Sequence, residues 1–237
     1  MTRIVRKIIT TEELSGMNLF DILGPVMVGP SSSHTAGAVR IGYTARTLLG
    51  STQISAEIGL HGSFAATGRG HGTDRALVAG LLGMKPDDMR IPESFEIAKN
   101  QGMQFLIENV QIAGAHPNTA RLRVKDKQGN ELEVQASSVG GGRILINKLD
   151  GITVNCTGEG PTLIVHNQDH PGHVSEVTTM LAKREINIAT LQLYRNKRGG
   201  DAVMVIEIDQ PVPEEAVRWL EQRPGIMKVT YLNGAEV

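Results

Sequence analysis

The first clear hydrophobic pattern in the chain follows a turn signal at Gly29-Pro30. Apolar side chains then recur at roughly helical spacing, at Ala36, Val39, Tyr43, Leu48 and Leu49. This period predicts a helix over about 33–49 that stops at Gly50. Five polar residues stand at its expected N-terminus: Ser31, Ser32, Ser33, His34 and Thr35. A helix N-terminus carries unpaired N–H groups and the positive end of the helix dipole, so this segment suits a carboxylate or a phosphate.

His34 adds a group that can exchange a proton near neutral pH. The alternative interpretation is a serine-rich helix cap with a surface histidine, and the local pattern leaves both interpretations open.

A second polar stretch, residues 61–75, follows a strand predicted by alternation over 52–60. Its glycines at 68, 70 and 72 would let the backbone approach a ligand closely or adopt positive φ. Their spacing does not match a dinucleotide-binding fingerprint. We expect a loop that enters the next helix, and a glycine-rich connector is the alternative. Its candidate ligand-binding residues are Gly70, His71, Gly72, Thr73 and Asp74. Because both helix-entry segments carry a histidine, we expect them to share one site.

The rest of the first part mixes helices and hairpins without regular strand–helix alternation, which indicates an α+β fold. A strand is expected at 4–9 and a short helical turn begins at Asn18. Further strands are expected at 105–112, 119–126, 131–137, 144–146 and 152–154, with a helix near 94–101.

A linker over 157–161 separates this part from a compact second unit, so we place two domains at 1–158 and 159–237. In the second unit, strands are expected at 162–166, 186–194, 202–208 and 226–231, with helices over 174–184 and after Pro213. The order βαββαβ predicts a ferredoxin-like fold.

The composition is that of a globular protein with an aliphatic core, because 40% of the 237 residues are hydrophobic and only 3% aromatic. Twenty-four basic and 25 acidic residues give a net charge of −1, which does not favour a nucleic-acid partner. No apolar run approaches the length of a membrane span, and we expect no signal peptide. Cys156 is the single cysteine, so we expect a cytoplasmic protein in which this thiol is buried and inert.

The second unit resembles an ACT domain. The resemblance is carried by Asp169-x-Pro171-Gly172, the helix that follows, and Ile186-Asn187-Ile188. Domains of this family bind an amino acid in the first strand–helix loop, usually across a dimer interface. The resemblance therefore implies self-association and an effector pocket lined by Asn167, Asp169, His170, Gly172, Asn187 and Ile188.

The whole chain resembles the β subunit of iron–sulfur L-serine dehydratase. The matching motifs are Phe20-Asp21-Ile22-Leu23-Gly24-Pro25, Gly29-Pro30-Ser31-Ser32-Ser33-His34-Thr35, Gly62-Ser63-Phe64-Ala65 and Gly70-His71-Gly72-Thr73-Asp74. The first 155 residues are similar to the allosteric-substrate-binding type of domain found in some phosphoglycerate dehydrogenases.

This resemblance implies a lyase that converts L-serine to pyruvate and ammonia with a 4Fe–4S cluster. One cysteine cannot supply the three thiolates of such a cluster, so we expect a separate α subunit to hold it and expect no metal ligands on this chain. His34 is the expected catalytic residue for proton transfer, with His71 as the rival base. The hydroxyls and N–H groups of Ser31, Ser32, Ser33 and Thr35 would bind the carboxylate of L-serine.

Two other functions compete with a dehydratase. A non-catalytic module that senses serine fits both domain resemblances. A Ser–His hydrolase is disfavoured, because the adjacent Ser33 and His34 cannot easily face each other and the chain has no Gly-x-Ser-x-Gly elbow.

Overall fold

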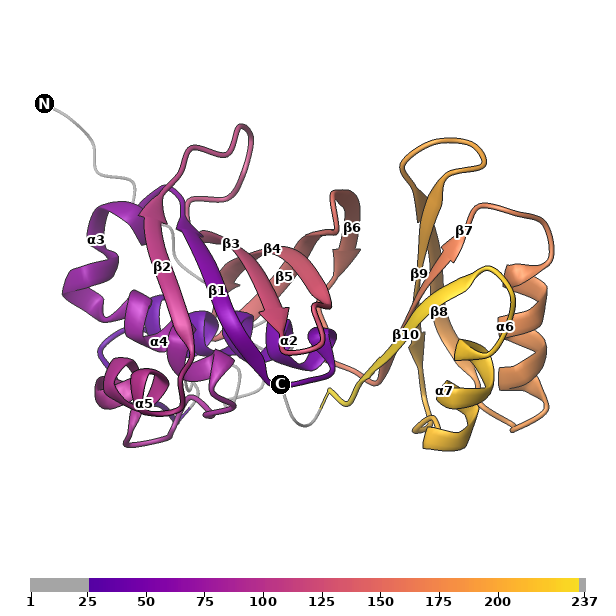
Figure 1. Ribbon diagram of the computed structural model, residues 1–237, viewed down its shortest axis with the longest axis horizontal. Coiled ribbons are helices and arrows are strands. Elements are labelled where there is room, and N and C mark those ends of the chain that lie inside the picture. The colour runs from indigo at the N-terminus through magenta and orange to yellow at the C-terminus, as the bar shows by residue number, and fades with distance from the viewer. Residues whose placement is uncertain (1–25, 235–237) are drawn as a thin grey trace, which may run out of the picture.

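The computed structural model describes residues 26–234, which form two β-sheets, each covered by helices on one face (Figure 1). The α+β class predicted from the sequence is confirmed. The strand expected at 4–9, the helical turn expected at Asn18 and the motif at 20–25 lie outside the described residues.

Six strands form the first sheet in the order β2-β1-β3-β4-β5-β6. β1 and β2 are parallel, and the other neighbours are antiparallel. The connection from β1 to β2 therefore has to cross over the sheet, and it carries three α-helices. The strands are β1 (Gln53–Leu60), β2 (Gln104–Asn109), β3 (Thr119–Asp126), β4 (Glu131–Gly140), β5 (Arg143–Leu149) and β6 (Ile152–Cys156).

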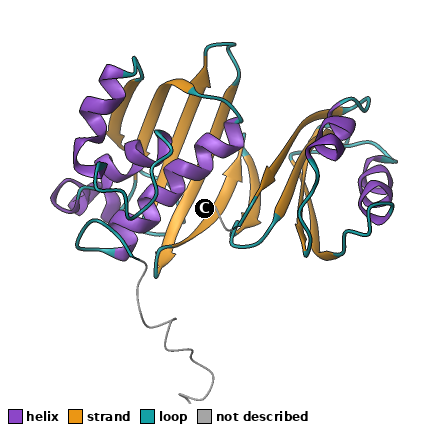
Figure 2. Cartoon of the chain, turned by 90° about the horizontal axis from the view of Figure 1, so that it is seen from below, coloured by secondary structure: helices purple, strands orange, loops and turns teal. Residues whose placement is uncertain are grey.

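The helices of this part lie on one face of the sheet (Figure 2). The strands alternate accordingly: in β1, Ala56 and Ile58 are buried and Glu57 between them is exposed. The helices are the π-helical turn η1 (Ser32–Gly37), α2 (Ala38–Leu49), α3 (Ser63–His71), α4 (Thr73–Leu81), the 3₁₀ turn η2 (Ile91–Glu93) and α5 (Ser94–Asn100). The predicted helix end at Gly50 is confirmed, because Gly50 adopts φ 78° and its N–H donates to the carbonyl of Arg46.

Helices α2 and α4 cross in direct backbone contact because each has a glycine at the crossing. A Cβ on Gly80 would meet the carbonyl oxygen of Val39 and lie 2.6 Å from the nitrogen of Tyr43. A Cβ on Gly42 would meet the carbonyl oxygen of Leu77. One polar segment, η1, directly precedes α2, and the other, which includes α3, directly precedes α4. The crossing of α2 and α4 therefore helps to fix the distance between the two polar segments.

The loop predicted over 61–75 is wrong, because α3 occupies most of it. Only Gly72 of the three glycines has positive φ, at 69°, and it forms the corner between α3 and α4. Gly68 lies inside α3, where a Cβ would come within 3.2 Å of the Thr73 side chain. The polar, glycine-rich composition indicates a loop locally, and tertiary packing overrides that preference.

Four strands form the second sheet in the order β10-β7-β9-β8, all antiparallel, with the expected ferredoxin-like arrangement. Two helices pack on one face of it (Figure 1). The sequence predicted Asn187 to lie within a strand that starts at residue 186. The structure places Asn187 just before β8, which starts at Ile188. The elements are β7 (Thr162–Gln168), α6 (His173–Ala182), β8 (Ile188–Arg195), β9 (Asp201–Ile208), α7 (Glu214–Glu221) and β10 (Ile226–Leu232).

The helix-free face of the second sheet packs against the first part of the chain. Its side chains at Ile164, Val203, Val205 and Leu232 belong to the same buried apolar cluster as the core of the first sheet. The Lys228 ammonium on β10 donates to the carbonyls of Leu48 and Leu49, at the C-terminus of α2. A cation there satisfies carbonyls that a helix end leaves without partners.

Candidate active site

The π-helical turn η1 forms the polar N-terminus of the first helix. Ser31 is its N-cap, and its Oγ accepts a hydrogen bond from the N–H of His34 at 3.2 Å. Thr35 donates its N–H to the Ser31 carbonyl at 2.8 Å, so the N–H groups of Ser32 and Ser33 have no acceptor inside the helix. Gly37 lets η1 approach β4, since a Cβ there would lie 2.7 Å from the Ser138 Cβ. The polar helix N-terminus with free N–H groups that the sequence predicted is therefore present, and anion binding there stays a prediction.

His34 is buried, with 9% of its surface exposed, and α3 supplies most of its contacts. Its Nε2 lies 3.2 Å from the hydroxyl of Ser63 and 3.2 Å from the hydroxyl of Thr67. The His34 ring meets the ring of Phe64 edge-on, with centroids 5.3 Å apart. The ring of His71, the last residue of α3, has its centroid 4.9 Å from that of His34. The two histidines predicted to share a site are thus in contact.

The surroundings of His34 favour its neutral form. Burial lowers the pKa of His34 below its ordinary value of 6.5, and the nearby His71 lowers the pKa further. A backbone hydrogen bond at Ser63 raises the pKa and opposes these two effects. A neutral imidazole has one nitrogen with a free lone pair, so His34 is able to accept a proton near neutral pH.

A cavity of about 430 Å³ opens beside the two histidines. The hydroxyl oxygen of Thr35 is buried and has no hydrogen-bond partner among the described residues, and Thr35 lines this cavity. His71 is exposed and lines it too, whereas His34 is buried, in ring contact with His71, and is not among the lining residues. The complete lining is Val28, Gly29, Thr35, Gly70, His71, Gly72, Asp74, Arg75, Ile91, Pro92 and Phe95.

The structure brings most of the predicted substrate residues to this cavity and leaves others aside. Gly70, His71, Gly72, Asp74 and Thr35 line it directly. Thr73 is fully buried beneath the surface, and its hydroxyl has no partner among the described residues. Ser32 and Ser33 are half-buried on η1, outside the cavity lining.

Sequence reasoning missed the roles of Ser63, Thr67 and Arg75. Ser63 and Thr67 contact His34 because they lie one turn apart on α3, and that helix was not expected. Arg75 adds a cation to the cavity wall, where its guanidinium stands 5.6 Å from the Phe95 ring and donates to the Pro92 carbonyl. A helix predicted over residues 63–71 would have placed Ser63 and Thr67 on the same helix face.

The residues predicted for the effector pocket do not converge within one chain. Asp169 accepts hydrogen bonds from Arg195 and from the N–H of Gly199, both at 2.9 Å, at one end of the second sheet. The backbone hydrogen bond from Gly199, and then Arg195, lower the pKa of Asp169, so its carboxylate stays ionised. Asn187 donates to Asp209 at 2.6 Å, beside the opposite end.

The strand register gives the separation of these two residues. Gln168, which precedes Asp169, pairs with Asp201, and Ile188, which follows Asn187, pairs with Ile208. Those partners are seven residue steps apart along β9, which is about 23 Å at the usual rise of a strand. Of the other predicted residues, Asn167 is buried on β7, His170 and Gly172 are exposed in the loop after β7, and Ile188 is half-buried at the start of β8.

For an enzyme of the kind the resemblance implies, replacing Asp169 by asparagine should change the serine concentration at which the assembled complex reaches half its maximal rate. The reason is that the hairpin between β8 and β9 would lose its charged anchor, and coupling between distant sites typically amounts to about a 5- to 150-fold change in affinity. Steady-state kinetics over a range of serine concentrations measures this. Asp201→Asn, in the same hairpin, is the matched control and should leave the serine dependence unchanged; an unchanged dependence in Asp169→Asn contradicts the prediction.

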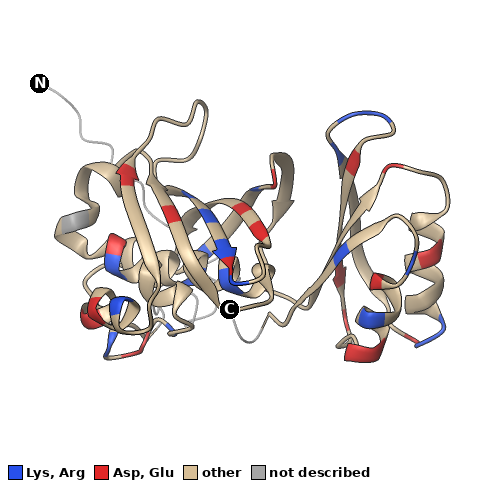
Figure 3. Cartoon of the chain, in the orientation of Figure 1, with Lys and Arg blue, Asp and Glu red and all other residues tan. Residues whose placement is uncertain are grey.

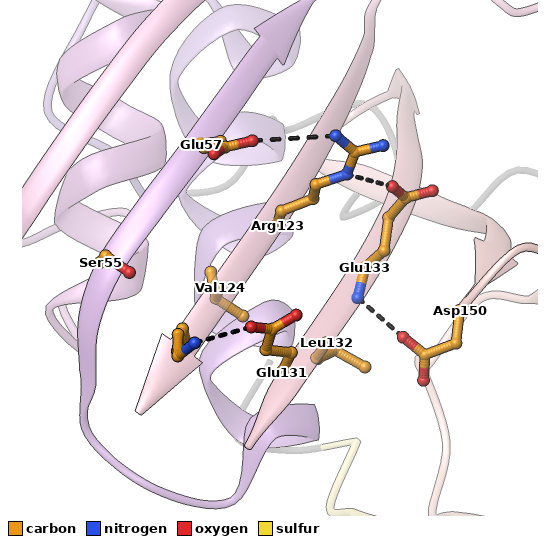
Figure 4. Close-up of a pocket in the computed structure, with 9 residues that line it drawn as sticks. Ser55, Glu57, Arg123, Val124, Glu131, Leu132, Glu133 and Asp150 are labelled. Carbon is orange, nitrogen blue, oxygen red and sulfur yellow. Dashed lines mark hydrogen bonds and ion pairs between the residues drawn. The ribbon is translucent and has the colours of Figure 1, made fainter. Parts of the chain in front are cut away.

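A second hollow of about 270 Å³ lies on the open face of the first sheet, away from His34 (Figure 4). Arg123 stands between Glu57 and Glu133, with nitrogen–oxygen distances of 3.8 and 2.5 Å. Lys125 pairs with Glu131 at 2.8 Å. These exposed side chains neutralise one another, and surface pairs of this kind contribute little to stability because water screens them. We assign no ligand to this hollow.

Cys156 lies on β6 and is buried, as the sequence predicted. Burial raises the pKa of the Cys156 thiol to about 11, so it stays protonated at neutral pH. Across residues 26–234, no group of three or more His, Cys, Asp or Glu side chains is arranged to hold a metal ion. The donor set of this part of the chain therefore does not fit a 4Fe–4S cluster.

The chain purified alone should be colourless and contain no stoichiometric iron, because its one thiol is buried and protonated. Iron analysis and the visible absorption spectrum test this, and a 4Fe–4S band from the isolated chain would contradict it.

Cys156 should resist alkylation in the native chain and react after denaturation in urea. In an enzyme of the kind the resemblance implies, Cys156→Ser should leave the activity of the complex largely intact.

Basic and acidic side chains are interspersed over both sheets (Figure 3). The ladder of Glu57, Arg123 and Glu133 on the first sheet is an example of this alternation. None of the helices within the described residues is both long enough and apolar enough to cross a membrane.

Comparison with known proteins gives two family matches. Residues 17–103 match the model of the serine dehydratase beta chain, and residues 161–225 match that of the ACT domain. The chain is 40% identical to a probable L-serine dehydratase beta chain of Bacillus subtilis, over 91% of this chain and 97% of that protein. It is also 40% identical to the L-serine dehydratase beta chain of Peptoniphilus asaccharolyticus, over 85% of this chain and 91% of that one.

A different kind of enzyme shares part of the sequence. A D-3-phosphoglycerate dehydrogenase of Methanocaldococcus jannaschii is 33% identical over 60% of this chain and 31% of its own length. This match agrees with the domain resemblance expected from the sequence.

Proposed function

The chain belongs to the family of L-serine dehydratase beta chains, and on that premise we propose that it is the β subunit of an enzyme converting L-serine to pyruvate and ammonia. The observation that carries the proposal is the meeting of His34 and His71 beside a polar helix N-terminus and a cavity. Such a site offers a neutral base next to groups that bind a carboxylate.

The residues of this chain take the following roles in the proposal. The substrate carboxylate lies against the hydroxyls of Ser31, Ser32, Ser33 and Thr35 and the free N–H groups of η1. His34 takes the proton from Cα, and the electron pair of that bond forms a double bond to Cβ as the Cβ–O bond breaks. The resulting enamine takes up water and releases ammonia, which leaves pyruvate.

Further contacts come from the second helix entry. Gly70, Gly72 and Asp74 line the cavity beside His71, and the buried Thr73 supports them from beneath the surface. We infer that a partner subunit takes up the hydroxyl group that leaves Cβ. No residue of this chain is assigned that role.

A separate α subunit is the partner in this proposal, and it holds the 4Fe–4S cluster that would supply the Lewis acid. This assignment is supported by the single buried cysteine of the present chain. We further propose that the protein is cytoplasmic, that the boundary between its two domains lies at 158/159, and that the ACT domain associates with a second copy and binds L-serine.

A mixing experiment tests the proposed function. The chain is added to an anaerobically prepared, cysteine-rich partner encoded beside it, and pyruvate formation from L-serine is followed. Activity that needs both proteins, with iron in the co-purified complex, supports the proposal. A complex with a full complement of iron that forms no pyruvate, together with serine binding by the isolated chain, would instead support a regulatory module that senses serine.

A further inference from the structure

Both ring nitrogens of His34 have hydroxyl neighbours, and these neighbours differ in what they can donate. Nε2 lies 3.2 Å from the oxygens of both Ser63 and Thr67. Nδ1 lies 3.4 Å from the oxygen of Ser31. A neutral imidazole carries one N–H and one lone pair, so the hydroxyl hydrogens decide which nitrogen has the lone pair.

On the Nε2 side, the hydrogen of Thr67 is already used. The Thr67 hydroxyl donates to the carbonyl of Ser63, one turn earlier in α3, at 3.0 Å. A hydroxyl has a single hydrogen, so the oxygen of Thr67 can only accept from Nε2. If Nε2 carried the lone pair, this 3.2 Å contact would place two lone pairs against each other.

On the Nδ1 side, the hydrogen of Ser31 is free. The oxygen of Ser31 accepts the backbone N–H of His34 at 3.2 Å, which occupies one of its two lone pairs. In the free chain its hydrogen can therefore point at Nδ1, and it can turn to the substrate carboxylate when that binds, which leaves the lone pair of Nδ1 open. The contacts of Thr67 and Ser31 agree: the N–H belongs on Nε2, where the Ser63 oxygen can also accept it, and the lone pair belongs on Nδ1.

The segment that carries the two hydroxyls is held firmly in place. The N–H of Ser63 donates to the Pro117 carbonyl at 2.7 Å. Gly62 before it has φ 57°, and a Cβ there would lie 2.8 Å from the Cα of Pro117. The first turn of α3 therefore presents a fixed pair of oxygens to the ring, which the edge contact with Phe64 also restrains.

We propose that Ser63 and Thr67 are positioning residues that hold His34 in the Nε2–H tautomer, so that Nδ1 is the nitrogen that takes the proton of the substrate. This rests on the proposed function only for the proton transfer. The tautomer itself is a property of this chain alone. Nδ1 faces Ser31, at the helix end proposed to bind the substrate carboxylate, which places the basic atom on the substrate side of the ring.

The tautomer is tested by long-range ¹H–¹⁵N correlation NMR on the chain labelled with ¹⁵N-histidine, at a pH above 7 where His34 is neutral. The signals of His34 are assigned by their loss in His34→Ala. We expect the pattern of an Nε2–H imidazole in the wild-type chain. A pattern with the proton on Nδ1 overturns the proposal, whatever reaction the enzyme catalyses.

The positioning role is tested by Thr67→Val, which keeps the shape and removes the hydroxyl. In the assembled enzyme, we expect kcat to fall on the order of 10- to 100-fold, as when an orienting partner is removed, with KM changed by less than about 3-fold. The His34 signals should move away from the pure Nε2–H pattern. Thr67→Ser restores the hydroxyl and should restore both properties.

Thr178→Val is the matched control. Thr178 also donates to the carbonyl four residues earlier, at 2.9 Å on α6, and it does not touch His34. This control should keep the wild-type kcat and spectrum. If Thr67→Val fails to fold, Ser63→Ala is measured in the same way. Wild-type kcat and an unchanged spectrum in a folded Thr67→Val or Ser63→Ala chain contradict the positioning role.

Discussion

Replacing His34 by alanine should lower the kcat of the assembled enzyme by a factor of at least 10² to 10⁴, the usual contribution of a positioned general base. Serine binding should weaken far less, because in the proposed function the serines of η1 hold the carboxylate. Ser32→Ala or Ser33→Ala should act mainly on KM, since a contact made equally in the ground state and the transition state lowers KM alone. Steady-state kinetics with an intact cluster-bearing partner separates these effects.

The pH dependence of the wild-type enzyme checks the same assignment. A base must be neutral to accept a proton, and burial and His71 lower the pKa of His34 below 6.5. The midpoint of the acid-side fall in kcat/KM should therefore lie below pH 6.5, the ordinary pKa of a histidine. His71→Ala is the comparison variant. Near-normal turnover in His34→Ala, together with inactive His71→Ala, would show that His71 is the base.

Replacing Gly80 by alanine should lower the free energy of unfolding strongly, and far more than the same replacement at Gly160. The new methyl group would press on the backbone of α2, at the carbonyl of Val39 and 2.6 Å from the nitrogen of Tyr43. Backbone atoms cannot rotate away as a side chain can, so the two helices have to separate. Overpacking typically costs about 1–3 kcal/mol, and a backbone clash places Gly80→Ala at or above the upper end.

Urea denaturation of the isolated chain measures this change in the free energy of unfolding. Gly160→Ala is the control, because a Cβ at Gly160 meets nothing within 4 Å and its φ is not positive. This control should stay within about 0.5 kcal/mol of the wild type, as most exposed substitutions do. A Gly80→Ala chain as stable as the control would contradict the close crossing of α2 and α4.

Most of the secondary structure was predictable because its signals are local. The apolar period over 36–49 predicts α2, and the alternation in β1 and β3 follows directly from one covered and one open sheet face. Ser31 is the N-cap within the serine run that the sequence indicated. The order of elements in the second unit was also predictable, since each turn signal lies between two clear patterns.

The geometry of the candidate site depends on contacts that no local pattern carries. His34 on η1 meets His71 at the end of α3, next to the close crossing of α2 and α4, and the glycines of that crossing, Gly42 and Gly80, appear in the sequence only as weak helix formers. Helix α3 was missed because its glycines favour a loop locally, and with it were missed Ser63 and Thr67. The π-helical form of η1 likewise has no sequence signal that we could use.

The placement of Asp169 and Asn187 at opposite ends of the second sheet has a consequence for stoichiometry. A pocket that uses both residues can exist only where the Asp169 end of one copy meets the Asn187 end of another. A two-fold symmetric contact would create such pockets in pairs, each made equally by both copies. Dilution that separates the copies would abolish both pockets, so the response to an effector would depend on the concentration of the protein as well as that of the ligand.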